Sequence, residues 1–243
     1  MQAFDRVLFT FLLPIKPRRN CGVIFTVNRF TDQELAAVYR VMRERRDMRH
    51  FLPDRVEPEV LQRLLGAAHL APSVGLMQPW RFVRITDTAL RGRIHRLVDA
   101  ERLATAQVMG QREASFMQLK VEGIEQCGEL LVAALMDKRE EHIFGRRTLP
   151  EMDLASVSCA IQNLWLAARA EGLGMGWVSM FDPLALAKLL AMPTGAKPVA
   201  ILCLGHVKEF YPAPMLELEG WTKGAPANKT LFHNFWGIHE STP

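Results

Sequence analysis

A long apolar stripe near the middle of the chain predicts its most buried helix. From Asp153 onward, apolar residues recur at steps of three or four, the spacing that places them on one face of a helix. They are Leu154, Val157, Ile161, Leu164, Trp165 and Ala168. Gly172 follows where a helix needs a left-handed closing residue. Residues 174–181 then predict a strand, and Gly174 and Gly176 at its start indicate that another backbone or a flat ligand comes close.

Weaker patterns predict the elements around this helix and strand. Thr31 and Glu34 form a capping box at the start of one helix, and Pro58 falls in the first turn of a second. Short apolar runs predict strands at residues 81–86, 129–136 and 198–204, and a short helix is expected over 183–192. The polar, mostly helical stretch 88–126 has a weak apolar stripe and predicts a mobile cover more than a core element. Residues 138–150 predict a charged loop.

The ends of the chain differ from the middle. With 243 residues and no Ser-, Pro- or Gly-rich linker, the sequence predicts one domain over residues 31–243. The apolar run from Val7 to Leu13 is far shorter than the roughly 20 residues of a membrane span, and no secretory signal is clear, so residues 1–30 are expected to be a disordered arm. The tail from Lys208 is irregular, and its large apolar groups without an evident core are expected to pack on a partner subunit. They are Trp221, Phe232, Phe235 and Trp236.

Composition excludes several classes of protein. Apolar residues make up 49% and charged residues 23%, an ordinary globular balance, and a net charge of +4 is too small and scattered to imply nucleic acid. Cys159 and Cys203 lie in apolar runs and are expected to be buried thiols, which indicates a reduced, cytoplasmic protein. No histidine has metal-ligand spacing, so no metal site is expected. The glycines at 172, 174 and 176 precede a strand, whereas a dinucleotide-binding fingerprint follows one.

Two stretches carry candidate chemistry. Arg45, Arg46 and Arg49 bracket Asp47 at the end of the first helix. Cations there can simply complement the helix dipole, but guanidinium forks also suit a phosphate. The loop from Ala71 to Trp80 offers backbone donors, a hydroxyl and an amide together, more than a plain surface turn requires.

These residues resemble the BluB branch of the nitroreductase superfamily, the 5,6-dimethylbenzimidazole synthases. The resemblance covers residues 31–237, and its motifs come in the right order: RRDMR at 45–49, APSVG at 71–75, MQPW at 77–80, LKVEG at 119–123, MDL at 152–154, QNLWL at 162–166 and GWVS at 176–179. Ordinary nitroreductases usually carry a serine where this chain has Asp47, so the narrower resemblance rests mainly on that residue.

The resemblance implies an α+β nitroreductase-like fold, with a mixed central sheet surrounded by helices, in a homodimer with reduced FMN at the subunit interface. It further implies that FMN is a substrate, which O2 fragments to 5,6-dimethylbenzimidazole, the lower ligand of vitamin B12, and erythrose 4-phosphate. A separate NAD(P)H-dependent flavin reductase would supply the reduced FMN. The implied catalytic residues are Asp47 and Ser179. The implied flavin-binding residues are Arg45, Arg46, Asp47, Met48, Arg49, Ser73, Gln78, Pro79, Leu119, Lys120, Gly176 and Ser179.

Two alternatives stay open at this stage. An FMN-dependent nitro or quinone reductase or dehalogenase of the same fold would keep its flavin, and Asp47 argues against it. A non-catalytic flavin-binding protein is disfavoured only by the joint presence of Asp47 and Ser179. In the tail, relatives often place arginines after a Gly-Trp pair, whereas this chain offers only Lys223 as a further phosphate contact.

Overall fold

The computed structural model describes residues 29–226 and 230–237 and divides the chain into a unit up to Val38 and a unit from Tyr39 to the end. The arm predicted over residues 1–30 lies, up to residue 28, outside the described residues. In the first unit, the predicted capping box is present, since the Thr31 N–H donates to Glu34 Oε2 (2.7 Å) and the Glu34 N–H donates to Thr31 Oγ1 (3.3 Å). It opens α1 (Asp32–Glu44), which continues into the second unit.

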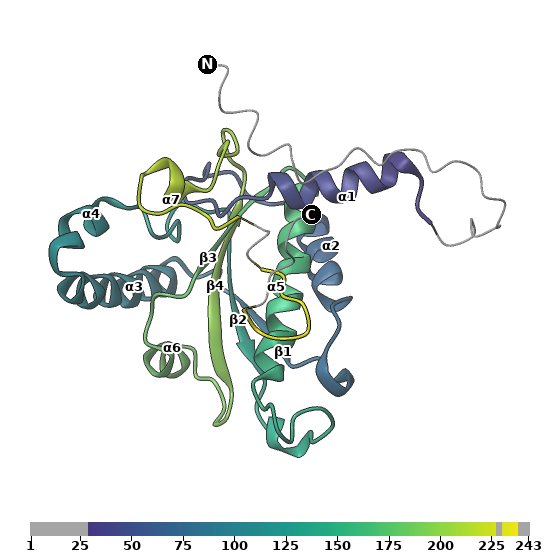
Figure 1. Cartoon of the computed structure of the whole chain (residues 1–243). Coiled ribbons are helices and arrows are strands. Elements are labelled where there is room, and N and C mark those ends of the chain that lie inside the picture. Colours follow the sequence, from purple (N-terminus) through teal and green to yellow (C-terminus); the bar gives the residue numbers. More distant parts are fainter. Residues whose placement is uncertain (1–28, 227–229, 238–243) are drawn as a thin grey trace. The chain divides into compact units, whose positions relative to one another are not determined.

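Four strands form the sheet of the second unit (Figure 1). They are β1 (Trp80–Arg84), β2 (Glu129–Leu135), β3 (Gly174–Val178) and β4 (Lys197–Gly205), in the spatial order β1-β2-β4-β3. Every strand pair is antiparallel, so the expected mixed sheet is wrong for the described strands. Its one parallel element among the described residues is an isolated bridge between Asp47 and Met175 on the outer side of β3. The predicted strand over 174–181 stops at Val178.

Helices cover both faces of this sheet (Figure 1). On one face lie α2 (Pro58–His69) and α5 (Met152–Ala170), whose contacts with each other and with the strands form the larger core. On the other lie α3 (Thr88–Val108) and α6 (Pro183–Leu189). Because side chains alternate along a strand, Leu131 of β2 enters the first core while Leu130 and Val132 enter the second.

The central helix matches its prediction closely, with two exceptions. Val157, Ile161 and Leu164 are fully buried, as the apolar stripe predicts. Leu154 is exposed, and the prediction of a buried Cys159 thiol is wrong. Two residues along a helix turn the side chain to roughly the opposite side, so Cys159 faces away from the core that holds Val157. Cys203, in the middle of β4, is buried as predicted.

The prediction of a cover over residues 88–126 is only partly right. Asp87 caps α3 by accepting the Leu90 N–H (2.9 Å), and Ile94 and Val98 are fully buried in the second core, so this half of the segment is a core element. The remainder consists of a short turn, α4 (Glu113–Gln118) and an irregular loop up to β2. Its Phe116 belongs to a third, separate apolar cluster.

The tail is not wholly without partners. After α7 (Met215–Leu218), Trp221 packs against the third cluster, and the Arg112 guanidinium lies 3.4 Å from the centre of its ring. The prediction that Trp221 lacks a core partner is therefore wrong. Phe235 and Trp236 remain highly exposed. No helix in the described part of the chain is both long enough and apolar enough to cross a membrane.

Candidate active site

A cleft of about 600 Å³ lies where the end of α1, the outer edge of β3, the α4 segment and the tail meet. Its polar side carries arginines, and its apolar side carries aromatic and methionine side chains. The lining residues are Met42, Arg43, Arg45, Arg46, Asp47, Arg49, Thr105, Met109, Phe116, Leu119, Lys120, Val121, Trp177, Val178, Ser179, Met180, Pro214, Met215, Leu216 and Trp221. The cleft brings together seven of the residues that the resemblance implies for the flavin site: Arg45, Arg46, Asp47, Arg49, Leu119, Lys120 and Ser179.

Main-chain pairing fixes the segment that carries Asp47. The Met48 N–H donates to Met175 O (2.9 Å), and the Met48 side chain is buried. Gly176 makes this approach possible, because a Cβ on it would lie 2.3 Å from Met48 O and 2.5 Å from Arg49 Nη1. Met48 and Gly176 are therefore framework beneath the cleft. The predicted close approach at this glycine is confirmed, with backbone as the neighbour.

Asp47 is held on several sides. Arg49 Nη1 and Nη2 donate to its two carboxylate oxygens at 2.7 Å each, and the Trp177 N–H donates to Oδ1 (2.9 Å). Arg49 Nη2 also donates to Trp177 O (3.0 Å). Although 43% of the Asp47 side chain is accessible from the cleft, desolvation by the surrounding protein raises the pKa of its carboxyl, and the Arg49 charge and the Trp177 N–H oppose that shift.

The three arginines are not equivalent. Arg49 is committed to Asp47, and Arg46 Nη1 donates to the carbonyls of Arg43 and Arg45, both at 2.7 Å. The Arg45 guanidinium stacks 4.4 Å from the centre of the Trp165 ring and makes no hydrogen bond or ion pair with any described residue. The Nε atoms of Arg46 and Arg49 are buried without a partner in the described residues. Of Arg45, Arg46 and Arg49, Arg45 is thus the one most available to a ligand anion.

Ser179 follows directly after β3 and is exposed at the cleft. Its hydroxyl has no hydrogen-bond partner within the described part of the chain, so it is free to meet a ligand. Leu119 and Lys120 enter from the loop after α4. Asp47, Ser179 and Lys120, far apart in sequence, therefore face one space.

Ser73, Gln78 and Pro79 do not line the cleft within one chain. Ser73 Oγ accepts the Gln78 N–H (3.0 Å), and the neighbouring Val74 N–H donates to Ser156 Oγ at the start of α5 (3.1 Å). Trp80 begins β1 opposite Leu135, at the far end of β2 from the loop that carries Lys120. The loop is thereby directed toward the start of α5.

Some lining residues are absent from the sequence prediction. Phe116 and Trp221 form an aromatic wall, with ring centroids 6.2 Å apart, and Arg112 joins their segments by donating to Trp221 O (2.9 Å). The only signal in the sequence for these two residues is the presence of a large aromatic side chain in an otherwise polar or irregular stretch. Nothing in the spacing shows that the two segments meet.

The fold and this cleft define a class of protein. The chain belongs to the nitroreductase family, whose family model matches residues 42–206. Within that class, it is 43% identical over 185 residues to the 5,6-dimethylbenzimidazole synthase of Rhodospirillum rubrum, covering 75% of this chain and 87% of that protein. It is 40% identical over 192 residues to the synthase of the same name from Rhodobacter capsulatus, covering 78% and 93%.

A solved structure shares this fold. Oxidised iodotyrosine deiodinase bound to FMN and 3-iodo-L-tyrosine matches with a TM-score of 0.60 and 24% identity, over 72% of this chain and 92% of that chain. At this identity the match shows the fold alone. It confirms the α+β nitroreductase fold expected from the sequence.

Proposed function

We propose that this chain is an enzyme that uses O2 to fragment reduced FMN, releasing 5,6-dimethylbenzimidazole and erythrose 4-phosphate and leaving the pyrimidine part of the isoalloxazine ring as a further product. The observation that carries the proposal is the Asp47 carboxylate in the wall of the cleft, held by Arg49 and the Trp177 N–H. The relatives named 5,6-dimethylbenzimidazole synthase support it, with identities of 43% and 40%. FMN is then the substrate of the reaction and not a retained cofactor.

The chemistry of the cleft fits a flavin mononucleotide. Arg45 offers a free guanidinium for a phosphate, which planar forks bind well. The buried Nε atoms of Arg46 and Arg49 lack partners among the described residues, as expected of a site that receives an anionic, hydrogen-bonding ligand. Phe116, Trp221 and Met180 supply an apolar surface for an aromatic ring system.

Asp47 is the group we assign to proton transfer. Breaking up a reduced flavin with O2 requires protons to move among nitrogen, oxygen and carbon atoms, and a placed carboxylate can take up and return them. The raised pKa of Asp47 brings its protonation equilibrium closer to neutral pH, which suits that task. The free hydroxyl of Ser179 can hydrogen-bond an oxygen that develops charge in the same space. With a ligand in the cleft, the aromatic wall would help to exclude water.

We further propose that the enzyme is a homodimer in which the loop carrying Ser73, Gln78 and Pro79 reaches the cleft of the partner. That loop does not reach the cleft of its own chain, and Phe235 and Trp236 are left exposed for a neighbour to cover. A separate NAD(P)H-dependent flavin reductase would deliver reduced FMN.

One experiment tests the main proposal. The protein is mixed with reduced FMN without oxygen, air is admitted, and the products are analysed by mass. We expect 5,6-dimethylbenzimidazole to appear as FMN disappears, with heat-denatured protein as the control. Full recovery of intact FMN, with hydrogen peroxide as the only product of O2, would contradict the proposal.

The second candidate is an FMN-dependent reductase or dehalogenase that keeps its flavin. The fold is shared with iodotyrosine deiodinase, whose solved structure is bound to FMN, so the fold is also compatible with this candidate. Its signature is catalytic oxidation of NAD(P)H with FMN recycled many times, with a nitro, quinone or halogenated aromatic acceptor. Product analysis and NAD(P)H oxidation can both be measured on the same protein preparation, so the two candidate functions are compared directly.

A further inference from the structure

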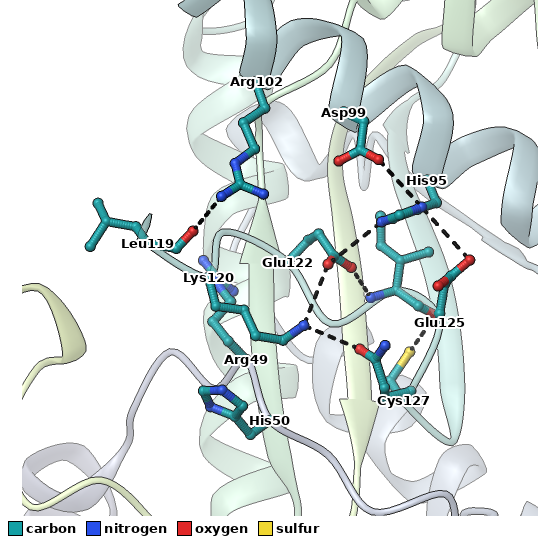
Figure 2. Close-up of polar contacts among 12 residues, drawn as sticks. Arg49, His50, His95, Asp99, Arg102, Leu119, Lys120, Glu122, Glu125 and Cys127 are labelled. Atoms are coloured by element: carbon teal, nitrogen blue, oxygen red, sulfur yellow. Dashed lines mark hydrogen bonds and ion pairs between the residues drawn. The ribbon is translucent and has the colours of Figure 1, made fainter. Parts of the chain in front are cut away.

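The ammonium group of Lys120, at the wall of the cleft, is held by its own loop (Figure 2). Lys120 Nζ lies 3.6 Å from Glu122 Oε1 and donates to Gln126 Oε1 (3.4 Å). A dashed line in Figure 2 joins Lys120 to Glu122. Of these three residues, only Lys120 lines the cleft. Glu122 and Gln126 contact Lys120 from outside the cleft wall.

Glu122 is a buried carboxylate with a fixed orientation. Its Oε2 accepts the Ile124 N–H (2.6 Å), and its Oε1 lies between Lys120 Nζ and the His95 ring, 3.7 Å from His95 Nε2. Its residue is only 9% exposed. An ionised carboxylate is costly to bury unless it is paired and hydrogen-bonded. Its position is therefore explained by the groups it faces, and the cation it faces toward the cleft is Lys120.

The loop around Glu122 is tightly packed. A Cβ on Gly123 would lie 2.5 Å from the Phe51 ring, and the Cys127 N–H donates to Gly123 O (3.0 Å). At the start of the loop, Arg102 of α3 donates to Leu119 O (3.0 Å). The loop backbone therefore holds Glu122 in place, and Glu122 can hold Lys120.

We propose that Glu122 is a positioning residue that fixes the Lys120 ammonium at the cleft before an anionic flavin arrives. The proposal rests on the proposed function only in taking reduced FMN as the ligand. A lysine side chain loses much rotamer freedom when it is ordered, and prior positioning removes that loss from the binding step. Glu122 does not line the cleft, so its effect on the ligand passes through Lys120.

A double-mutant cycle tests this on the full chain. Glu122→Gln keeps the shape and an oxygen that can accept the Ile124 N–H, but removes the charge that faces Lys120. Reduced FMN is titrated anaerobically against Glu122→Gln, Lys120→Met and the double variant. Because contacting residues commonly couple, we expect Glu122→Gln to weaken binding about tenfold alone but less than about twofold in the Lys120→Met background.

Glu125→Gln is the matched control. Glu125 belongs to the same loop and also lies 3.7 Å from His95, at Nδ1, but it has no contact with Lys120 in the described structure. This variant should bind reduced FMN as the parent does. If Glu122→Gln does not fold, Gln126→Leu takes its place in the cycle, because Gln126 is exposed and contacts Lys120 from the other side. We expect a smaller loss there, again absent with Lys120→Met.

Three results would overturn the inference. The first is an equal loss of affinity from Glu122→Gln in the parent and Lys120→Met backgrounds, which would indicate a purely structural role. The second is unchanged binding in Glu122→Gln. The third is tighter binding in Glu122→Gln, which would mean that the carboxylate holds Lys120 away from the ligand. Because the cycle reads flavin binding and not product, it remains decisive even if the parent enzyme forms no dimethylbenzimidazole. Product formation by the parent chain tests the proposed function separately.

Discussion

Arg49 grips Asp47, two residues before it, through two hydrogen bonds of 2.7 Å, one to each carboxylate oxygen. The arginine side chain is nearly buried, while the carboxylate keeps access to the cleft. The pair therefore combines an oriented carboxylate with an arginine that has little freedom to do anything else. The main role of Arg49 is therefore to orient the Asp47 carboxylate. Only donors that this pair leaves unused, such as its Nε atom, remain for a phosphate.

Replacing Asp47 with asparagine tests the assignment of proton transfer. The Asp47→Asn side chain would keep the shape and most hydrogen bonds but could not take up a proton, so we expect dimethylbenzimidazole formation to fall about 10²-fold or more, in the range of general acid–base catalysis. Reduced FMN should still bind and be oxidised by air, with intact FMN and peroxide as products. Product analysis by mass after one turnover provides the measurement. Near-parental product from this variant would remove Asp47 from the mechanism.

The pH dependence should follow the electrostatics of the same pair. Burial raises the pKa of Asp47, and the Arg49 charge opposes that rise. If the ionised carboxylate accepts the proton, the rate falls as pH drops through this pKa. Arg49→Gln removes the opposing charge, so the pKa rises further and the acid limb of the rate profile moves to higher pH. Single-turnover rates at saturating reduced FMN, measured at pH values on both sides of this limb, give the shift. A limb that moves to lower pH would contradict this prediction. Arg63→Gln is the control, because Arg63 pairs with Glu171 and not with Asp47.

Arg45 should be the principal phosphate ligand among the three arginines, since its guanidinium is the one without a hydrogen bond in the described chain. Arg45→Ala should weaken reduced FMN by roughly ten- to 150-fold, the equivalent of the about 1.5–3 kcal/mol of a hydrogen bond to a charged group. Reduced riboflavin, which lacks the phosphate, should bind almost unchanged. Anaerobic titration of both ligands gives the comparison. Equal weakening of the two would assign Arg45 to another part of the ligand.

Gly176→Ala should damage the framework beneath Asp47. The new Cβ would lie 2.3 Å from Met48 O, so the segment of Met48 must shift away from β3. We expect a loss of about 1–3 kcal/mol in the free energy of unfolding, typical of overpacking, together with lower activity. Gly66→Ala in α2 is the control, because nothing lies within 4 Å of its added Cβ, and it should stabilise by about 0.5–1 kcal/mol. Urea denaturation followed by circular dichroism compares the two variants.

Asp153 should be important for stability and not for chemistry. This buried carboxylate in the first turn of α5 accepts from Arg139 Nε (2.8 Å) and Arg146 Nη2 (3.1 Å), whose side chains are also largely buried. Asp153→Ala leaves both arginines without their carboxylate and should cost about 3–5 kcal/mol. Glu151→Ala, an exposed change next to the same helix, should stay within about 0.5 kcal/mol. Equal midpoints in urea for the two variants would contradict this account.

The sequence predicts the helices and strands well, but it predicts the tertiary contacts between them poorly. The stripe through Val157 and Ile161 determines α5 because burial of one helix face requires that spacing, and the apolar run around Ile201 predicts β4 for a similar reason. Local spacing does not show that the loop after α4 and the tail meet, so the wall formed by Phe116 and Trp221 is absent from the prediction.

For the candidate site, residue type is more predictable than role. The RRDMR run identifies charged groups at one place, but only the fold shows that Arg49 is taken by Asp47 while Arg45 stays free. Cys159 gives a second example of this limit. Its neighbours in sequence are apolar, but they do not determine which way one side chain points from a helix, and Cys159 is exposed. The placement of Ser73 and Gln78 likewise depends on where the start of β1 lies, which no short pattern contains.

The parallel bridge between Asp47 and Met175 has a consequence for how such an enzyme can change over time. The main chain of this segment pairs with the edge of the sheet, whereas the Asp47 carboxylate lies in the wall of the cleft and holds Arg49 and the Trp177 N–H. A substitution here can exchange the reacting group while the main-chain pairing of Met48 with Met175 stays in place. The position is therefore evolvable within limits: a replacement leaves the scaffold intact only if it still accepts hydrogen bonds from the nearly buried Arg49 and from the Trp177 N–H.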